Sequence, residues 1–235
     1  MKRNHSKYQA ITFGRVERNP VLTCEGTVIP IQDEMELLGV NIDNKLRFEG
    51  QIRKICRKVS QQVVVLNRLK KILPFELRTD IYRAFIAPHF NYCSESWHHC
   101  GKRGCAKLEK INEQALRFVT RDKSTTYETL LKQLNLLSPL NQRIVKMATG
   151  VYKAIHGYKV PRGIGELLQL IIILARGKHI LELPKVNTTT YGLKSWRYTA
   201  AKIWNALPDQ FRAAINKIGK FKNLMSKLDF SNFTF

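Results

Sequence analysis

Acidic residues are scarce in this sequence. Only 18 aspartates and glutamates stand against 40 lysines and arginines, which gives the 235-residue chain a formal net charge of +22. The aspartates are dispersed, and the sequence has no Asp-x-Asp, aromatic-x-Asp-Asp or His-Glu-x-x-His motif. It therefore offers no carboxylate pattern for a two-metal or zinc enzyme. A net charge of only about 2 to 8 is enough to keep a small domain soluble. The excess positive charge therefore predicts a polyanionic partner, with nucleic acid as the first candidate and an anionic membrane surface as the second.

Other expected features are also missing. The five cysteines are an odd number without regular spacing, which argues against a secreted disulfide framework. No apolar stretch follows the charged N-terminus as in a signal peptide, and the most apolar run, 167–175, is shorter than the roughly 20 residues of a membrane span. P-loop and Gly-x-Ser-x-Gly motifs are absent. We expect an intracellular protein, nuclear or cytoplasmic, with no cofactor, no small-molecule substrate and no membrane partner.

The N-terminal segment of the chain has the pattern of short strands and turns. Residues 21–24 and 27–29 are rich in β-forming residues and flank a Glu-Gly pair, which is typical of a two-residue hairpin turn. A further strand is expected over 36–42, where the sequence is too apolar for a solvated edge. So few strands cannot bury both faces of a sheet. Residues 1–45 therefore predict one flank of a small antiparallel sheet.

From residue 46 apolar residues recur at spacings of three and four, which is typical of helices that pack through one face. We expect a long amphipathic helix that stops before Pro74, then a helix over 75–87 that Pro88 ends. Further helices are expected at 108–119, at 127–134 behind a capping box of Thr125 and Glu128, and from Ser138-Pro139 to Gly157.

Residues 158–193 lose this period and are rich in glycine and proline, so they predict a linker with short strands at 171–174 and 180–183. Helical spacing returns after Ser195, the expected N-cap. The fold class predicted is α+β, mainly α. Its segments are the β-sheet segment 1–45, the helical segment 46–157, the linker 158–193 and the C-terminal helices 194–235.

The first long helix carries its cations mostly off its apolar face. Lysines and arginines aligned along a helix can follow phosphates from turn to turn, and Tyr82, Tyr92 and Trp97 either add base stacking or belong to the core. The alternative is a basic face that only solvates the helix. The candidate nucleic-acid-binding residues here are Arg53, Lys54, Arg57, Lys58, Arg68, Lys70 and Lys71.

One cluster has residue types that suit zinc, namely Cys93, His98, Cys100 and Cys105. Its spacing does not match a zinc finger, because the first two cysteines are too far apart for a knuckle and no second pair follows at finger distance. The alternative is a turn between two helices, with Cys93 and Trp97 packed inward as such residues usually are.

Four strings of the sequence occur together in a familiar order. They are LLGVNIDNKLRF at 37–48 followed by Gln51-Ile52, FIAPHFNYC at 85–93 with Trp97, EKINEQALR at 109–117, and TTTYGL at 188–193 followed by WNALP at 204–208. This order resembles the segment downstream of the catalytic core in reverse transcriptases of non-LTR (LINE-type, jockey-like) retrotransposons. The resemblance covers about residues 5–225, and 165–175 depart from the family's pattern.

The resemblance implies roles by position. Residues 6–9 would follow the catalytic turn, which places Lys7 near the lysine of polymerase motif D. Residues 1–45 would be the edge of a palm domain, and 46–157 a helical thumb that holds the template–primer duplex. The residues of a primer-grip-like strand would be Leu37, Leu38, Gly39 and Val40.

The same resemblance places the fingers, the catalytic aspartates and the aromatic-x-Asp-Asp turn before residue 1. It implies a truncated, catalytically incomplete RNA-directed DNA polymerase fragment, for which Mg²⁺ belongs only to an intact parent enzyme. The expected activity is binding of an RNA or DNA template–primer duplex. The alternatives are a domesticated basic nucleic-acid-binding module and a thumb subunit that acts with a separate palm-bearing chain.

Overall fold

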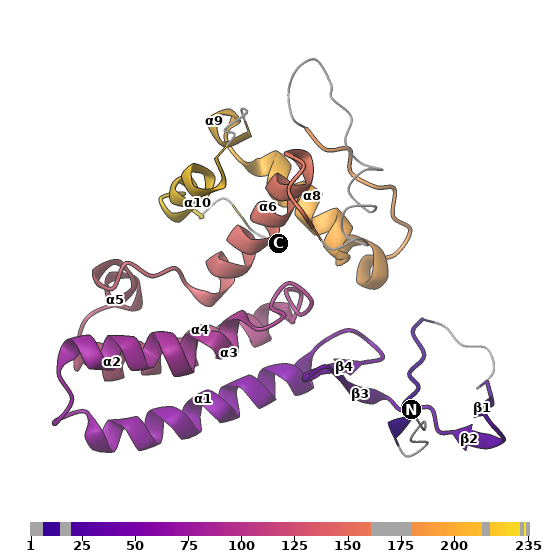
Figure 1. Ribbon diagram of the computed structural model, residues 1–235, viewed down its shortest axis with the longest axis horizontal. Coiled ribbons are helices and arrows are strands. Elements are labelled where there is room, and N and C mark those ends of the chain that lie inside the picture. The colour runs from indigo at the N-terminus through magenta and orange to yellow at the C-terminus, as the bar shows by residue number, and fades with distance from the viewer. Residues whose placement is uncertain (1–6, 15–19, 161–179, 213–216, 231–232, 234–235) are drawn as a thin grey trace. The chain divides into compact units, whose positions relative to one another are not determined.

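The computed structural model is mainly helical, and its described residues include two small antiparallel sheets (Figure 1). The described residues are 7–14, 20–160, 180–212, 217–230 and 233. The predicted mainly helical α+β class is therefore confirmed, whereas the strand expected at 171–174 lies outside the described residues. Contacts divide the chain into two units. Unit 1 comprises Met1–Cys93 and His99–Val119, and unit 2 comprises Ser94–His98 and Thr120–Phe235.

Unit 1 opens with the predicted hairpin. Strands β1 (Leu22–Cys24) and β2 (Thr27–Ile29) pair antiparallel. The two residues between them, Glu25 and Gly26, both have positive φ, at 50° and 77°. Two positive φ values give the turn a twist that matches that of the flanking strands. The local turn chemistry therefore determines this element, as the sequence predicted.

The strand predicted over 36–42 is wrong, because the chain turns inside it. Strands β3 (Glu34–Leu37) and β4 (Val40–Asp43) form a second hairpin with Leu38 and Gly39 at its tip, where φ is 48° and 82°. Leucine rarely adopts a positive φ, so the sequence gives no signal of a turn at Leu38. The tip is also solvated rather than buried: Leu38 is 82% exposed, and only Val40 joins the core.

Asp43 ends β4 and shapes the loop into the next helix. Its carboxylate accepts hydrogen bonds from the backbone N–H groups of Lys45, Arg47 and Phe48. Helix α1 (Glu49–Leu69) then begins, and its apolar face is buried as the periodicity predicted. A backbone turn over 70–73 separates the end of α1 from Pro74, so the helix is shorter than expected.

A single helical run follows Pro74. It consists of α2 (Phe75–Ile81), the π-helical segment η2 (Tyr82–Ile86) and α3 (Ala87–Asn91). The prediction that Pro88 ends the helix is wrong. In η2 the N–H of Ala87 bonds to the carbonyl of Tyr82, five residues back, and Pro88 enters at the start of α3, where a proline's missing N–H costs little.

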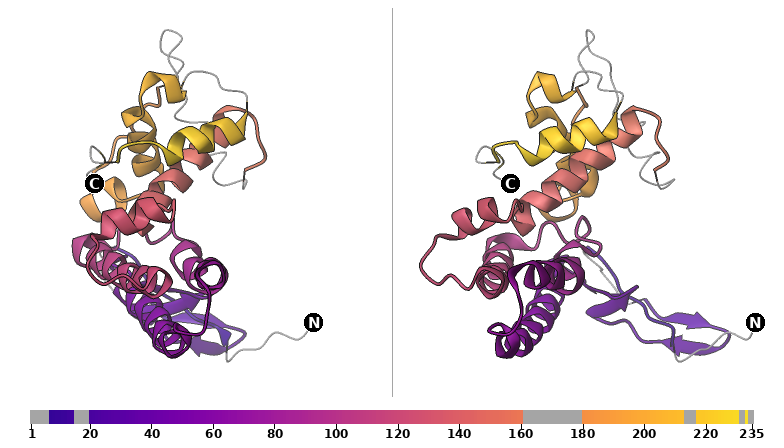
Figure 2. Two further views of the ribbon diagram at one scale, coloured as in Figure 1. Left: turned by 90° about the vertical axis from the view of Figure 1, so that its left-hand side faces the viewer. Right: turned by 60° about the vertical axis from the view of Figure 1, so that its left-hand side comes forward.

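Helix α4 (Gly101–Thr120) contains the predicted 108–119 helix and packs beside α1 and α2 in unit 1 (Figures 1 and 2). The buried hydroxyl of Tyr82 donates to Asn112 Oδ1 at 2.7 Å. Buried Arg78 donates from Nε to the carbonyl of Val119 at 2.7 Å. These contacts connect the α2–η2–α3 run to α4.

Three helices of unit 2 begin with a hydrogen-bonded N-cap residue, and the sequence predicted two of these residues correctly. Ser138 and Ser195 cap their helices by accepting from Asn141 N–H and Tyr198 N–H. The cap of the short helix is Thr126 rather than Thr125, whose hydroxyl donates to Asp122 instead. The helices are α5 (Tyr127–Gln133), α6 (Pro139–Ile155), the π-helical segment η3 (Thr189–Leu193), α8 (Trp196–Ala206), α9 (Asp209–Arg212) and α10 (Ile218–Ser226).

The core of unit 2 lies among α6, α8 and α10. Tyr152 of α6 stacks on Phe221 of α10 with ring centroids 4.4 Å apart, and Trp204 of α8 lies 6.1 Å from Phe221. Of the strand predicted at 180–183, only Leu181 takes part in a β-bridge, and the other three residues are not in a strand. The side-chain amide of Asn205 also bonds both backbone groups of Leu181, at 2.7 and 2.9 Å, and holds that segment against α8.

Candidate nucleic-acid interface

The exposed cations of α1 lie along its outer face. Arg53, Arg57 and Arg68 are all exposed. Arg53 and Arg57 are four residues apart and therefore neighbours on the helix surface. Arg57 and Arg68 are three turns apart on one line, with Gln61 and exposed Val64 between them. The predicted cationic face is thus dense only near the start of α1.

The structure does not bring the remaining predicted cations to that face. Lys54 is 20% exposed, because its Nζ donates to the carbonyl of Gly39 at 3.0 Å and pairs with Glu36 at 2.8 Å. It therefore holds the second hairpin on α1. Lys58 is exposed but lies toward α3. There, burial lowers the pKa of His89, and the Lys58 charge lowers it further. Lys70 and Lys71 lie in the turn after α1, and Lys7 is exposed near the start of the described chain.

Helix α4 carries a second cationic row, which the sequence interpretation missed. Arg103, Lys107 and Lys110 are exposed, and Gln114 and half-buried Arg117 continue the row. The spacings of four, three, four and three place all five on one side of the helix. The spacing of three and four residues that identified the α1 cations also identifies this row in the sequence. Arg117 also pairs with Glu113 at 2.6 Å, so its charge is partly neutralised.

The two rows lie on adjacent helices. A β-carbon in place of Gly104 hydrogen would be 3.5 Å from Ile52 Cγ1, so the start of α4 lies against α1. Further along the two helices, burial raises the pKa of the Cys56 thiol, and the positive charge of Lys107 lowers that pKa in part. Lys107 of α4 therefore lies near Cys56 of α1. Because Arg53 shares that side of α1 with Cys56, the rows run next to each other. We call Arg53, Arg57, Arg103, Lys107 and Lys110 the α1–α4 surface.

The aromatic residues considered for base stacking do not belong to this surface. Tyr82 and Trp97 are 1% and 0% exposed and are core residues. Tyr92 is half-exposed, and its hydroxyl donates to the carbonyl of Leu38 at 2.6 Å. Stacking by the two buried rings is therefore ruled out in this fold.

The primer-grip-like residues occupy the tip of the second hairpin. Leu37 and Leu38 are exposed there, and Val40 is buried. The backbone carbonyls of Leu38 and Gly39 accept the bonds from Tyr92 and Lys54. A tight turn, bound by Lys54 of α1 and by Tyr92 just after α3, thus lies where the sequence predicted a strand.

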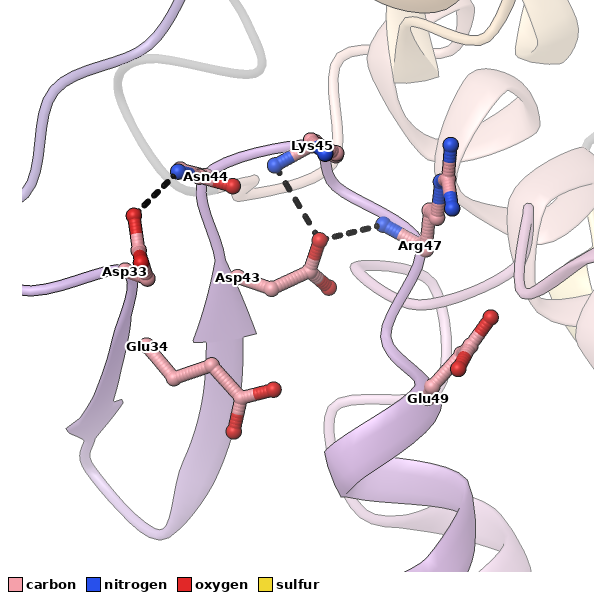
Figure 3. Close-up of a pocket in the computed structure, with 7 residues that line it drawn as sticks. All are labelled: Asp33, Glu34, Asp43, Asn44, Lys45, Arg47 and Glu49. Atoms are coloured by element: carbon pink, nitrogen blue, oxygen red, sulfur yellow. Dashed lines mark hydrogen bonds between the residues drawn. The ribbon is translucent and has the colours of Figure 1, made fainter.

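A polar pocket of about 260 Å³ lies where β4 leads into α1 (Figure 3). Four carboxylates line it, and two of them have structural partners: Asp43 accepts the loop N–H groups, and Asp33 accepts from Asn44 at 2.7 Å. Carboxylates are stabilised near a helix N-terminus. The lining residues are Asp33, Glu34, Asp43, Asn44, Lys45, Arg47 and Glu49. The acidic lining disfavours phosphate, so this pocket shapes the loop.

The predicted zinc residues are not assembled. Among the residues that the structure describes, no three His, Cys, Asp or Glu side chains are placed to hold a metal ion together. The set Cys93, His98, Cys100 and Cys105 is therefore not a ligand cluster in this fold. Trp97 packs inward as the alternative predicted, whereas Cys93 is exposed.

Comparison of the chain with known protein families, with curated proteins and with solved structures finds no match in any of the three. Within the described residues, no helix is both long and apolar enough to cross a membrane. The functional assignment therefore depends on the residues of the site and on the sequence motifs.

Proposed function

We propose that this chain binds nucleic acid through contacts between the α1–α4 surface and backbone phosphates. The observation that carries the proposal is the pair of adjacent, exposed cationic rows on α1 and α4 in a chain of net charge +22. From Arg103 to Arg117 the α4 row is roughly 21 Å long at 1.5 Å per residue. Each cation that neutralises a phosphate releases condensed counterions, which favours binding without reading the sequence.

The resemblance to non-LTR reverse transcriptases supports a template–primer duplex as the ligand. In this proposal residues 46–157 act as the thumb and the hairpins as the edge of a palm. The chain holds the duplex and does not extend a primer by itself. A domesticated nucleic-acid-binding module, or a thumb subunit that acts with a separate chain, would use the same surface.

Charge removal from each row tests the surface. Two double variants, Arg53→Gln with Arg57→Gln and Lys107→Gln with Lys110→Gln, are compared with wild type by fluorescence anisotropy on an RNA–DNA hybrid and a DNA duplex across a salt series. We expect weaker binding to both duplexes. The slope of log K against log salt should become shallower by about 0.9 for each phosphate that the variant no longer neutralises.

A control variant separates local contacts from net charge. Lys222→Gln with Lys227→Gln removes two exposed charges in or beside α10, and it should reduce the affinity much less. Binding that is insensitive to salt, or equal weakening by the control, would contradict the proposed surface.

The absence of polymerisation by this chain alone is tested separately. The purified chain is incubated with a primed RNA template, deoxynucleotides and Mg²⁺, and no extension product is expected. A product that depends on Mg²⁺ would show that the chain is a polymerase and would overturn the binding-only proposal.

A further inference from the structure

Two cysteines lie in contact at the start of α4. Their sulfur atoms, Cys100 Sγ and Cys105 Sγ, are 3.7 Å apart. Both cysteines belong to unit 1, and neither is bonded to another cysteine in this structure. Cys100 is buried at 7% exposure, whereas Cys105 is only partly buried.

Gly104 is the residue that makes this contact sterically feasible. A β-carbon at that position would lie 3.0 Å from Cys100 Sγ and 3.1 Å from Cys100 Cβ, closer than side chains normally pack. Gly101, which has a φ of 75°, reverses the backbone between Cys100 and the helix. The two glycines thus let Cys100 fold back over the first turn of α4 toward Cys105.

We propose that Cys100 and Cys105 are a thiol-oxidation site, which a hydroperoxide converts to an intramolecular disulfide. Side-chain rotation must bring the two sulfurs from van der Waals contact to a bond length of about 2.05 Å. The inference is independent of nucleic-acid binding, because it concerns only these two side chains.

The chemistry balances in two steps. The more accessible thiolate, that of Cys105, attacks the terminal oxygen of the peroxide, forms a sulfenic acid and releases water or an alcohol. The thiolate of Cys100 then attacks that sulfur and expels hydroxide, which takes up a proton to give water. Two thiols lose two electrons and two protons in total, and the peroxide is reduced.

Peptide mapping of the full-length folded chain tests the site. The chain is treated with dilute hydrogen peroxide, alkylated under denaturing conditions and digested with trypsin. Because trypsin cleaves after Lys102 and Arg103, the disulfide joins peptide 84–102 to peptide 104–107. We expect this linked pair in the oxidised sample, two hydrogens lighter than the separate peptides, and its loss after treatment with a thiol reductant.

Serine variants identify the sulfur atoms involved, since peptide 84–102 also contains Cys93. Cys100→Ser and Cys105→Ser should each abolish the linked pair, and Cys93→Ser, the matched control, should leave it unchanged. Circular dichroism checks that each variant folds, and oxidation in urea should remove the preference for Cys100 over Cys93. The proposal fails if both thiols stay alkylatable, if the link passes through Cys93, or if it joins two chains on a non-reducing gel.

Discussion

Arg78 is a buried cation that serves as a hydrogen-bond donor to backbone groups. It is 4% exposed, and its guanidinium donates to the carbonyls of Val119 at 2.7 Å and Leu73 at 2.6 Å. It also lies over the ring of Phe75. The guanidinium thus satisfies one carbonyl in the turn after α1 and one at the end of α4, where the last carbonyls of a helix have no partner within it. Few other side chains can do this, because the planar fork donates in several fixed directions.

Arg78→Lys should therefore destabilise unit 1 although the charge is kept. An ammonium cannot reach the same carbonyls at once, and buried acceptors that lose a charged donor cost about 2–4 kcal/mol in the free energy of unfolding. Urea unfolding followed by circular dichroism measures the loss. Arg83→Lys, at an exposed position five residues further along the same helical run, should change it by less than about 0.5 kcal/mol. Equal effects of the two substitutions would refute this role of Arg78.

Individual residues were predictable where their partners are close in sequence. Ser138 and Ser195 were recognised as caps because each accepts from an N–H three residues later. Lys54 was predicted to bind nucleic acid because its partner, Gly39, is distant in sequence and comes close only in the fold. The role of Arg78 likewise depends on a distant partner, Val119. The prediction that Thr125 caps the short helix was wrong, because the hydroxyl of Thr125 donates to Asp122 and the next residue, Thr126, is the N-cap.

The second hairpin shows a conflict between residue type and local conformation. Leu38 has a φ of 48° and is 82% exposed, so it contributes backbone strain and little burial. Asparagine tolerates this region far better. The hairpin therefore forms because Gly39 permits the turn, Val40 is buried, and Lys54 and Tyr92 bind the tip from α1 and from the residue that follows α3.

Leu38→Asn should stabilise this hairpin by roughly 0.5–1 kcal/mol, since it relieves the strain and exposes less apolar surface. The melting temperature, and hydrogen exchange in β3 and β4, would show the gain. Leu37→Asn, one residue earlier in a strand, should give no gain because asparagine is a poor strand former. A stabilisation of similar size at both positions would mean that apolar exposure, and not φ, is responsible.

The helical run from α2 to α3 shows why element boundaries were harder to predict than elements. Proline ends most helices because it lacks an N–H. Here the π-helical segment changes the hydrogen-bond register just before Pro88 and lets a new α-helical segment start. Periodicity indicates helix on both sides, but it does not show such a shift in register.

At the scale of the whole molecule, the core of unit 2 joins helices that lie apart in the sequence. Phe221 is fully buried in unit 2 and contacts rings from α6 and α8. It therefore connects α10 to two helices that precede it in the chain.

Phe221→Ala should cost unit 2 roughly 3–5 kcal/mol, because it leaves a cavity among packed rings. We expect faster hydrogen exchange throughout α6 and α8, while amides of α1 in unit 1 keep their protection. Lys222→Ala, at the next, exposed position, is the control and should leave exchange in both units unchanged. Loss of protection confined to α10 would show that Phe221 does not hold the unit 2 core.

The candidate surface was partly predictable from the sequence. Composition and helical spacing indicated a basic protein with cations on α1, and the same spacing locates the α4 row. The sequence did not predict that the two rows are adjacent, because this depends on Gly104 lying against Ile52, more than fifty residues away. The palm, thumb and polymerase-fragment interpretation stays a prediction based on the four motifs.

The sequence by itself determined what local chemistry controls: the net charge, the amphipathic faces of α1 and α6, the Glu-Gly hairpin and the serine caps. Each of these depends on composition or on residues within a few positions of one another. The tertiary structure decided which charges remain exposed, where the second hairpin turns, and that Cys100 meets Cys105 instead of joining a zinc cluster. Those outcomes depend on long-range packing, in which burial and satisfied hydrogen bonds outweigh the preferences of single residues.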